Sequence, residues 1–406
     1  MRGTMARAAG RHRHVYNKRM ETANPQSDAA HVRRWTGTAG SGPWVPAAAD
    51  DRRPRILIVR LSAIGDVIHG LPIACALRER FPDALLTWVV EERAADVLRG
   101  HAALDRLIVL RHGWLKSPAA VWRLRRELRA LRLDVAIDAQ GLSKAAIAAW
   151  LSGAQRRIGP GGSWGRELSP WLNTELVDGD GLHPVNRGLR LLRPLGIESP
   201  AVRFQVPDFP TDRAAAEEIL RREGLPRPFV LVASGAGWSS KLWPVERHAA
   251  VAGYLGRRWG LPSLLTWGSA EERARAEGIA AAAEQAAPGA RHARVAPRMT
   301  LLELAALARR ARFCLGADTG PLHLAAAVGA ACVGLYGPWP AETHGPWGSQ
   351  HVIVQKMCME GSTRQRRRAG PTCMEAIDVA SVCEACDRLL ARNPAWMPLD
   401  HELSAK

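Results

Sequence analysis

The 406-residue chain has no long hydrophobic run and few cysteines. No stretch approaches the roughly 18 apolar residues that cross a bilayer, and the Arg-rich amino terminus lacks the apolar core of a secretory signal. The seven cysteines suit free thiols better than a disulfide framework, and the four at 358, 373, 383 and 386 match no standard zinc spacing. We therefore expect a cytoplasmic protein without a membrane-spanning segment or a metal site.

Acidic residues are scarce relative to basic ones. The chain has 39 Asp and Glu against 56 Lys and Arg, a net charge of +17, and five arginines between positions 123 and 132 crowd one predicted helix. A basic surface attracts nucleic acid, an anionic membrane or a phosphorylated substrate, although Ala- and Arg-rich chains are also basic without such a role. The sequence offers no helix-turn-helix or aromatic stacking surface, so a non-enzymatic nucleic-acid-binding protein is only a distant alternative.

Short apolar runs alternate with helical patterns along most of the chain, which predicts an α/β fold of two doubly wound, parallel-sheet, Rossmann-like domains facing a cleft. Ligands of such sheets bind beyond the carboxyl ends of the strands, in the crevice between domains. Residues 157–184 are predicted to be loop. The predicted divisions are a disordered basic extension (1–53), an amino-terminal domain (54–200), a linker (201–212), a carboxy-terminal domain (213–350) and a tail with a helix (351–406).

The segment Gly316–His323 joins a predicted strand to a predicted helix. Pro321 suits the first helical position, where its missing N–H costs nothing, and Thr319 or Gly320 suits the N-cap. Such a turn directs unpaired N–H groups and the positive end of the helix dipole toward one point, which favours a phosphate. An ordinary βα turn with a partly buried His323 is the alternative that this segment leaves open.

Asp66 stands where the first predicted helix of the amino-terminal domain begins. As a helix cap it would contribute about 1 kcal/mol. As a carboxylate on the floor of the cleft it could instead take a proton from a substrate hydroxyl. Arg60, at the end of the preceding strand, could hold a phosphate or pair with Asp66.

Two loops of the carboxy-terminal domain add candidate ligand groups. In Ser234–Pro244, small residues allow close backbone approach and Lys241 brings a positive charge, but the spacing is not that of a Walker A loop and does not indicate ATP hydrolysis. Glu271 and Glu272 follow the next strand, where a carboxylate could bind ribose hydroxyls. Both acids also suit an ordinary first helical turn.

Six segments from both domains, taken together, resemble one family over about residues 54–350. They are Arg60–His69, Trp88–Glu92, Ile137–Leu142, Ser239–Pro244, Pro297–Thr300 and Asp318–His323. In this order they resemble the lipopolysaccharide heptosyltransferases of glycosyltransferase family 9, most closely heptosyltransferase I. The resemblance implies a GT-B fold and inverting transfer of heptose from ADP-heptose to the Kdo–lipid A inner core, with no metal or other cofactor.

The resemblance also implies roles for individual residues. Asp66 matches the proposed catalytic base, Lys241 the lysine on the donor diphosphate, Glu272 the ribose ligand and Met299 a neighbour of adenine. The implied donor-binding residues are Ser234, Lys241, Glu272, Met299, Asp318, Thr319, Gly320 and His323. The implied acceptor- or phosphate-binding residues are Arg60, Ser62, Gly65 and Gln140.

Some features depart from the family pattern and leave the acceptor open. Arg60 replaces a lysine common in the type I enzymes, Gly235–Trp238 replaces a Thr-rich loop, and both chain ends are extended. A heptosyltransferase II-like activity, or a protein or glycan acceptor, remains an alternative. We expect a monomer that binds a nucleotide sugar but no nucleic acid, on the cytoplasmic face of the inner membrane if it associates with lipid.

Overall fold

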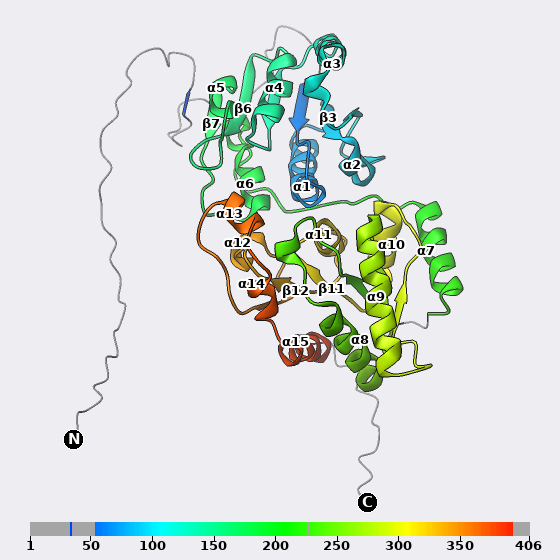
Figure 1. The fold of residues 1–406 in the computed structure, drawn as a ribbon. Coiled ribbons are helices and arrows are strands. Elements are labelled where there is room, and N and C mark those ends of the chain that lie inside the picture. The colour runs from blue at the N-terminus through cyan, green and yellow to red at the C-terminus, as the bar shows by residue number, and fades with distance from the viewer. Residues whose placement is uncertain (1–32, 35–52, 226–227, 393–406) are drawn as a thin grey trace, which may run out of the picture.

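The computed structural model describes residues 33–34, 53–225 and 228–392. Two parallel β-sheets with flanking helices form two Rossmann-like domains stacked against each other (Figure 1). The expected fold class is therefore confirmed. The extension predicted for residues 1–53 lies outside the described residues except for Arg33–Arg34 and Arg53.

The amino-terminal sheet has seven strands in the order β1-β7-β6-β5-β2-β3-β4. Its strands are β1 Arg33–Arg34, β2 Arg55–Val59, β3 Leu85–Glu91, β4 Arg106–Leu110, β5 Val135–Asp138, β6 Arg156–Pro160 and β7 Glu175–Val177. Its helices are α1 Ile64–Arg80, α2 Glu92–Ala95, α3 Pro118–Ala130, α4 Ser143–Leu151, α5 Ser169–Leu172 and α6 Pro184–Arg190, with 3-10 turns η1 Asp96–Leu98, η2 Trp114–Lys116 and η3 Arg193–Leu195.

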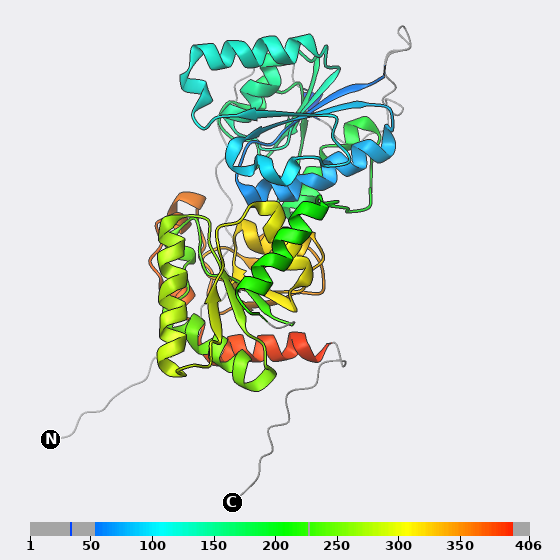
Figure 2. The ribbon, with the colours of Figure 1, turned by 90° about the vertical axis from the view of Figure 1, so that its right-hand side faces the viewer.

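The central strand β2 is buried on both faces, as expected for a parallel sheet between helical layers. Ile56 and Ile58 share a core with α1 and α6, whereas Leu57 and Val59 share one with α3 and α4. Figure 2 shows the consequence: α1 lies between the sheet and the carboxy-terminal domain, and α3 lies on the opposite, outer side.

The carboxy-terminal sheet has six strands in the order β10-β9-β8-β11-β12-β13. They are β8 Val230–Ala233, β9 Ser263–Thr266, β10 Ala293–Val295, β11 Phe313–Ala317, β12 Cys332–Tyr336 and β13 Val352–Gln355. The helices are α7 Pro210–Arg222, α8 Val245–Trp259, α9 Ala270–Ala286, α10 Leu301–Arg310, α11 Gly320–Ala327, α12 Ala341–His344, α13 Thr363–Arg367, α14 Thr372–Glu375 and α15 Val379–Ala391, with the 3-10 turn η4 Ser239–Lys241.

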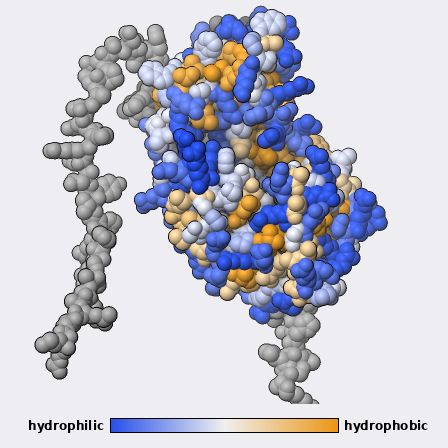
Figure 3. All heavy atoms as spheres, viewed as in Figure 1, coloured by the Kyte–Doolittle hydropathy of each residue, from blue (hydrophilic) through white to orange (hydrophobic). Residues whose placement is uncertain are grey.

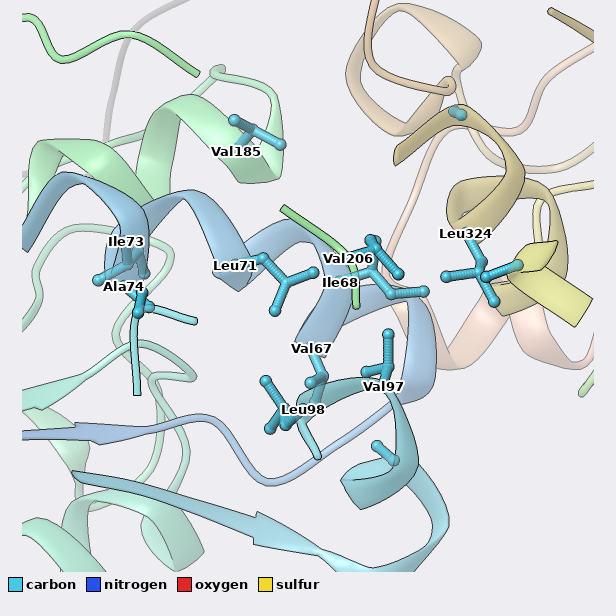
Figure 4. Close-up of a cluster of buried hydrophobic side chains, with 14 of the residues drawn as sticks. Val67, Ile68, Leu71, Ile73, Ala74, Val97, Leu98, Val185, Val206 and Leu324 are labelled. Atoms are coloured by element: carbon cyan, nitrogen blue, oxygen red, sulfur yellow. The ribbon is translucent and has the colours of Figure 1, made fainter. Parts of the chain in front are cut away.

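One hydrophobic core runs through the junction of the two domains. Ile68 of α1, Val206 of the connecting segment and Leu324 of α11 belong to the same buried cluster (Figure 4). All three side chains are almost fully buried. Burial of this apolar surface holds α1 against α11 in the arrangement described here.

The structure differs from the sequence-based expectations in several short elements. Residues 157–184, predicted as loop, contain most of β6 and all of α5 and β7. The helix expected from Val185 to Leu195 ends at Arg190 and is followed by a separate 3-10 turn. Within the extension predicted to be disordered, Arg33–Arg34 pairs with β7 as an edge strand.

The predicted linker and tail also contain parts of the fold. The helix α7 begins at Pro210, inside the linker predicted for 201–212, and Ile219 and Leu220 of α7 share a buried core with residues of α10. The edge strand β13 begins two residues beyond the predicted domain end at 350 and pairs with β12. Val382 and Cys386 of α15 are buried in the core of the carboxy-terminal domain, so the tail cysteine Cys386 packs as an apolar side chain.

Candidate active site at the junction of the two domains

The amino-terminal ends of α1 and α11 meet at the domain junction. A Cβ added to Gly320 would lie 2.8 Å from Cγ2 of Ile64, and one added to Gly65 would lie 2.9 Å from Cδ2 of His323. A side chain at either position would push the two helices apart or displace the side chain of Ile64 or the ring of His323. The absence of a side chain at both glycines therefore allows the start of α1, which carries Asp66, to touch the Asp318–His323 motif.

The turn before α11 has the predicted form with one change. Helix α11 begins at Gly320, so Pro321 is its second residue rather than its first, and Thr319 is the N-cap. The Thr319 hydroxyl donates to the Ala317 carbonyl, with an oxygen–oxygen distance of 3.2 Å, and does not cap the helix. The N–H groups of the first turn therefore keep their capacity to bind an anion.

Asp318 is the centre of a buried charged cluster. Its carboxylate accepts a hydrogen bond from Lys241 Nζ at 2.5 Å through Oδ2 and lies 3.0 Å from His323 Nε2 through Oδ1. Burial alone would raise the pKa of Asp318, but the His323 hydrogen bond and the Lys241 charge outweigh it and hold that pKa well below the ordinary value. The carboxylate therefore stays ionised, and the Lys241 ammonium is paired with it while also lying 4.2 Å from the ring centroid of Trp339.

A chain of histidines continues from this cluster across the domain junction. His323 Nδ1 lies 3.2 Å from His69 Nε2 of α1, and the His69 ring lies 5.2 Å from that of His183. His183 Nε2 lies 2.9 Å from the carbonyl oxygen of Gly345. Burial is the largest cause that lowers the pKa of His69, and it lowers that of His183 to about 4, so both rings are neutral at pH 7.

The roles of His69 and His183 at the junction were not predicted. His69 lies one helical turn after Asp66 on α1, which places the two residues on neighbouring positions of the same helix face. That spacing was visible in the sequence. The partnership of His69 with His323 was not, because 254 positions separate them.

The predicted base Asp66 is the third residue of α1 and its side chain is 46% exposed. Its Oδ1 lies 2.8 Å from Arg60 Nη2, and its Oδ2 accepts a hydrogen bond from the N–H of Ala63 at 3.2 Å. The sequence left open whether Arg60 binds a phosphate or pairs with Asp66, and in the structure it pairs with Asp66. Arg60 also donates a hydrogen bond to the carbonyl of Ala139. Asp66 thus combines a helix-capping contact with an accessible carboxylate.

Two predicted acceptor-side residues lie in networks with residues that were not predicted. Lys144 donates to Ser62 Oγ at 2.7 Å and to Glu91 Oε1 at 2.9 Å. Gln140 is buried, and its carbonyl oxygen accepts the N–H of Leu61 at 2.9 Å. The Gln140 side chain therefore holds the loop that carries Ser62, whereas Lys144 and Glu91 place charge beside it.

Two residues predicted to bind the donor follow neighbouring strands: Ser234 comes directly after β8, and Glu272 lies in the first turn of α9, which follows β9. Glu272 Oε2 accepts the N–H of Gly268 at 2.7 Å, and a Cβ added to Gly235 would lie 2.5 Å from the Glu272 carboxyl carbon. The hydroxyls of Ser234 and Ser240 are buried without a hydrogen-bond partner among the described residues. Both hydroxyls therefore keep unused hydrogen-bonding capacity in the loop that carries Lys241.

Met299 follows Arg298, which lines a pocket at the edge of the carboxy-terminal sheet, but Met299 itself does not line that pocket. Met299 is half-buried against the core that joins the two domains. The pocket reaches Arg298 but none of the predicted donor residues; its lining residues are Glu223, Trp267, Arg273, Glu277, Val295, Ala296, Pro297 and Arg298. The proximity of Met299 to adenine stays a prediction.

Residues 33–34, 53–225 and 228–392 form neither a cluster of metal ligands nor a membrane-spanning helix. Within that part of the chain, no group of three or more His, Cys, Asp and Glu side chains is placed to hold a metal ion. None of the helices described there combines the length and apolar character that a bilayer crossing demands.

Two parallel-sheet domains with strand-end loops meeting at their junction form the architecture of GT-B glycosyltransferases. Residues 121–371 match the model of glycosyltransferase family 9 (heptosyltransferase). The chain belongs to this family and is a glycosyltransferase.

Individual relatives and solved structures agree with this assignment. The lipopolysaccharide heptosyltransferase 1 of Salmonella typhimurium is 30% identical over 310 residues, which cover 73% of this chain and 93% of the relative. That of Pseudomonas aeruginosa is 29% identical over 361 residues, covering 83% and 98%. The structure of E. coli heptosyltransferase WaaC with ADP-2-deoxy-2-fluoro heptose has a TM-score of 0.62 and 26% identity, covering 82% of this chain and 99% of that one.

Proposed function

We propose that this chain transfers heptose from ADP-heptose to the lipopolysaccharide inner core, with Kdo–lipid A as acceptor and with inversion at the anomeric carbon. The observation that carries the proposal is the junction of α1 and α11, which brings the Asp66 loop against the Asp318–His323 motif. The relatives named lipopolysaccharide heptosyltransferase 1 support the choice of substrates.

In the proposed reaction Asp66 acts as general base. Its accessible carboxylate takes the proton of the acceptor hydroxyl, and the oxygen attacks the anomeric carbon of heptose from the face opposite ADP. The bond from that carbon to the diphosphate oxygen breaks, and its electron pair leaves with ADP. Arg60 holds the Asp66 carboxylate at 2.8 Å and so orients it.

The donor side stabilises the negative charge that grows on the departing diphosphate. Lys241 and the free N–H groups at the start of α11 supply positive potential there, and the buried hydroxyls of Ser234 and Ser240 can donate hydrogen bonds. Because Asp318 is paired with Lys241 in this structure, the diphosphate must share the ammonium with that carboxylate. Glu272, between two strand-end loops, is proposed to bind the ribose.

The deciding experiment combines the full chain with ADP-heptose and Kdo–lipid A and measures the acceptor by mass spectrometry. A gain of one heptose is expected, and EDTA should leave the rate unchanged. An acceptor that already carries one heptose serves as the comparison. Turnover only with that second acceptor, or a strict requirement for Mg²⁺, would contradict the proposal.

A further inference from the structure

Exposed tryptophans gather on the outer helical layer of the amino-terminal domain. Trp122 of α3, Trp150 of α4 and Trp171 of α5 are 58%, 46% and 76% exposed, and Leu168, directly before α5, is 51% exposed. Large apolar side chains usually leave water, so several on one layer indicate an interaction surface. Figure 3 shows apolar surface over α4 and α5 with hydrophilic surface around it.

The three helices form one continuous layer, on the side of the sheet away from the carboxy-terminal domain (Figures 1 and 2). A Cβ added to Gly153, just after α4, would lie 2.4 Å from the guanidinium carbon of Arg129 on α3. The N–H of Leu168 donates to Ser143 Oγ of α4 at 3.3 Å. We call Trp122, Trp150, Leu168 and Trp171, together with the arginines of α3, the outer face.

The charge of the outer face is strongly positive. Helix α3 carries four exposed arginines, and its one acidic residue is Glu127; the arginines are Arg123, Arg125, Arg126 and Arg129. None of the four forms an ion pair with another described residue. The guanidinium of Arg126 lies 4.8 Å from the ring centroid of Trp122, so cationic and aromatic groups are combined in one place.

The start of α4 lies beside the proposed acceptor residues, because its second residue, Lys144, donates to Ser62 Oγ at 2.7 Å and to Glu91 Oε1 at 2.9 Å. His112, between β4 and η2, lies 3.8 Å from Glu91, which bonds through Lys144 to Ser62 in the loop before Asp66. The outer face, which includes Trp150 of α4, therefore extends to the loop that carries Ser62. A flat binding partner on the outer face would leave Asp66 within reach of a substrate that is attached to that partner.

We propose that the outer face docks on a bilayer that contains anionic lipid, with the tryptophans at the interface and the arginines on headgroup phosphates. Amphipathic indole rings prefer the headgroup level, and clustered arginines favour a negative surface. The choice of a membrane as the partner, rather than another polyanion, rests on the proposed function, because the proposed acceptor is anchored in lipid. Docking would hold the enzyme on the surface that carries its acceptor.

The test is co-sedimentation of the full chain with phosphatidylcholine vesicles, with and without about one third phosphatidylglycerol. We expect binding to the anionic vesicles alone, weakened by salt. Arg125→Gln with Arg126→Gln, and separately Trp122→Ser, should weaken partitioning by about tenfold or more. Arg388→Gln on α15, an exposed arginine of the other domain, is the matched control and should bind as the unchanged chain does.

Two further measurements separate this inference from its alternatives. Circular dichroism should show that each variant is folded, and transfer to a deacylated, water-soluble acceptor should continue at the unchanged rate. Absence of vesicle binding, or equal binding by the outer-face variants, overturns the inference, as does stronger binding to single-stranded RNA under the same conditions. Vesicle binding does not require the nucleotide-sugar donor. The result would therefore remain valid even if the proposed transferase activity were not found.

Discussion

Asp318 is the carboxylate on which Lys241 and His323 converge at the proposed donor site. It is ionised, buried and paired with Lys241 at 2.5 Å. Breaking such a pair leaves an uncompensated buried charge, which costs more than the loss of an exposed ion pair. At the scale of single residues, the site thus depends on matched partners: Lys241 with Asp318, and Arg60 with Asp66.

The first residue-scale prediction concerns the base. Asp66→Ala should lower the transfer rate by about 10²–10⁴-fold, because no other group would take the hydroxyl proton. ADP affinity by calorimetry should change little, since Asp66 belongs to the other domain. Asp66→Asn, which keeps the contact with Arg60 but not the basic oxygen, should be equally slow. Turnover near the unchanged rate in either variant would remove Asp66 from the role of base.

A second prediction concerns Lys241. Lys241→Ala should weaken ADP binding by at least about tenfold, because one cation near the diphosphate is lost, and should also lower stability by about 3 kcal/mol through the unpaired Asp318. The double variant Lys241→Met with Asp318→Asn should recover much of that stability but not the ADP affinity. Calorimetry and urea denaturation measure the two effects. Unchanged ADP affinity in both variants would place Lys241 outside the donor site.

At the scale of elements, the contact between α1 and α11 brings the proposed base Asp66 and the proposed donor-binding residues to one junction. Gly65 and Gly320 allow the helix ends to touch, and the His69–His323 contact spans the same junction. The shared core around Ile68 and Leu324 maintains the approach. Activity should therefore respond to small changes in the spacing of these helices.

Gly65→Ala tests that dependence. The added Cβ would lie 2.9 Å from the His323 ring, so α1 and α11 must separate slightly or the ring must move. We expect a lower kcat with nearly unchanged ADP affinity. Gly278→Ala in α9 is the matched control, because its Cβ finds its nearest neighbour at 3.7 Å and the change should stabilise that helix by about 0.5–1 kcal/mol. Equal kcat in the two variants would show that the close approach is not required.

At the scale of the whole molecule, buried neutral histidines make stability depend on pH. Burial is the largest cause that lowers the pKa of His183 from 6.5 to about 4 and that of His248 to about 3. Between these values and 6.5, the unfolded chain binds protons that the folded chain does not. Stability is therefore fully present above about pH 6.5 and is lost as the pH falls.

Urea denaturation between pH 7.5 and 5 should show this loss. Each such histidine contributes a slope of about 1.4 kcal/mol per pH unit below its unfolded pKa. His183→Gln should reduce this slope by the contribution of one proton, because that variant no longer has a buried neutral imidazole at position 183. A free energy of unfolding that is constant from pH 7 to pH 5 would contradict the expected burial of neutral imidazoles.

Much of the fold and of the donor turn could be predicted from local sequence. Strands such as β5 and helices such as α8 follow from apolar runs and their boundaries, and the Asp318–His323 turn follows from Pro321 and its flanking glycine. The elements that were missed include the short β6, α5, β7, β10 and β13, and also the 13-residue helix α7, which begins inside the predicted linker. Their formation depends on pairing with a sheet or packing on neighbouring helices, which local propensity does not report.

The sequence by itself determined which residue types stand at the strand ends, because strand, turn and helix signals are local. Tertiary structure alone decided the partners: Lys241 with Asp318, 77 positions apart, and His69 with His323, 254 positions apart. It also decided that Gln140 supports a loop and that the tryptophans of α3, α4 and α5 share one outer layer. The physical reason is that burial and packing bring together distant segments whose local patterns carry no information about one another.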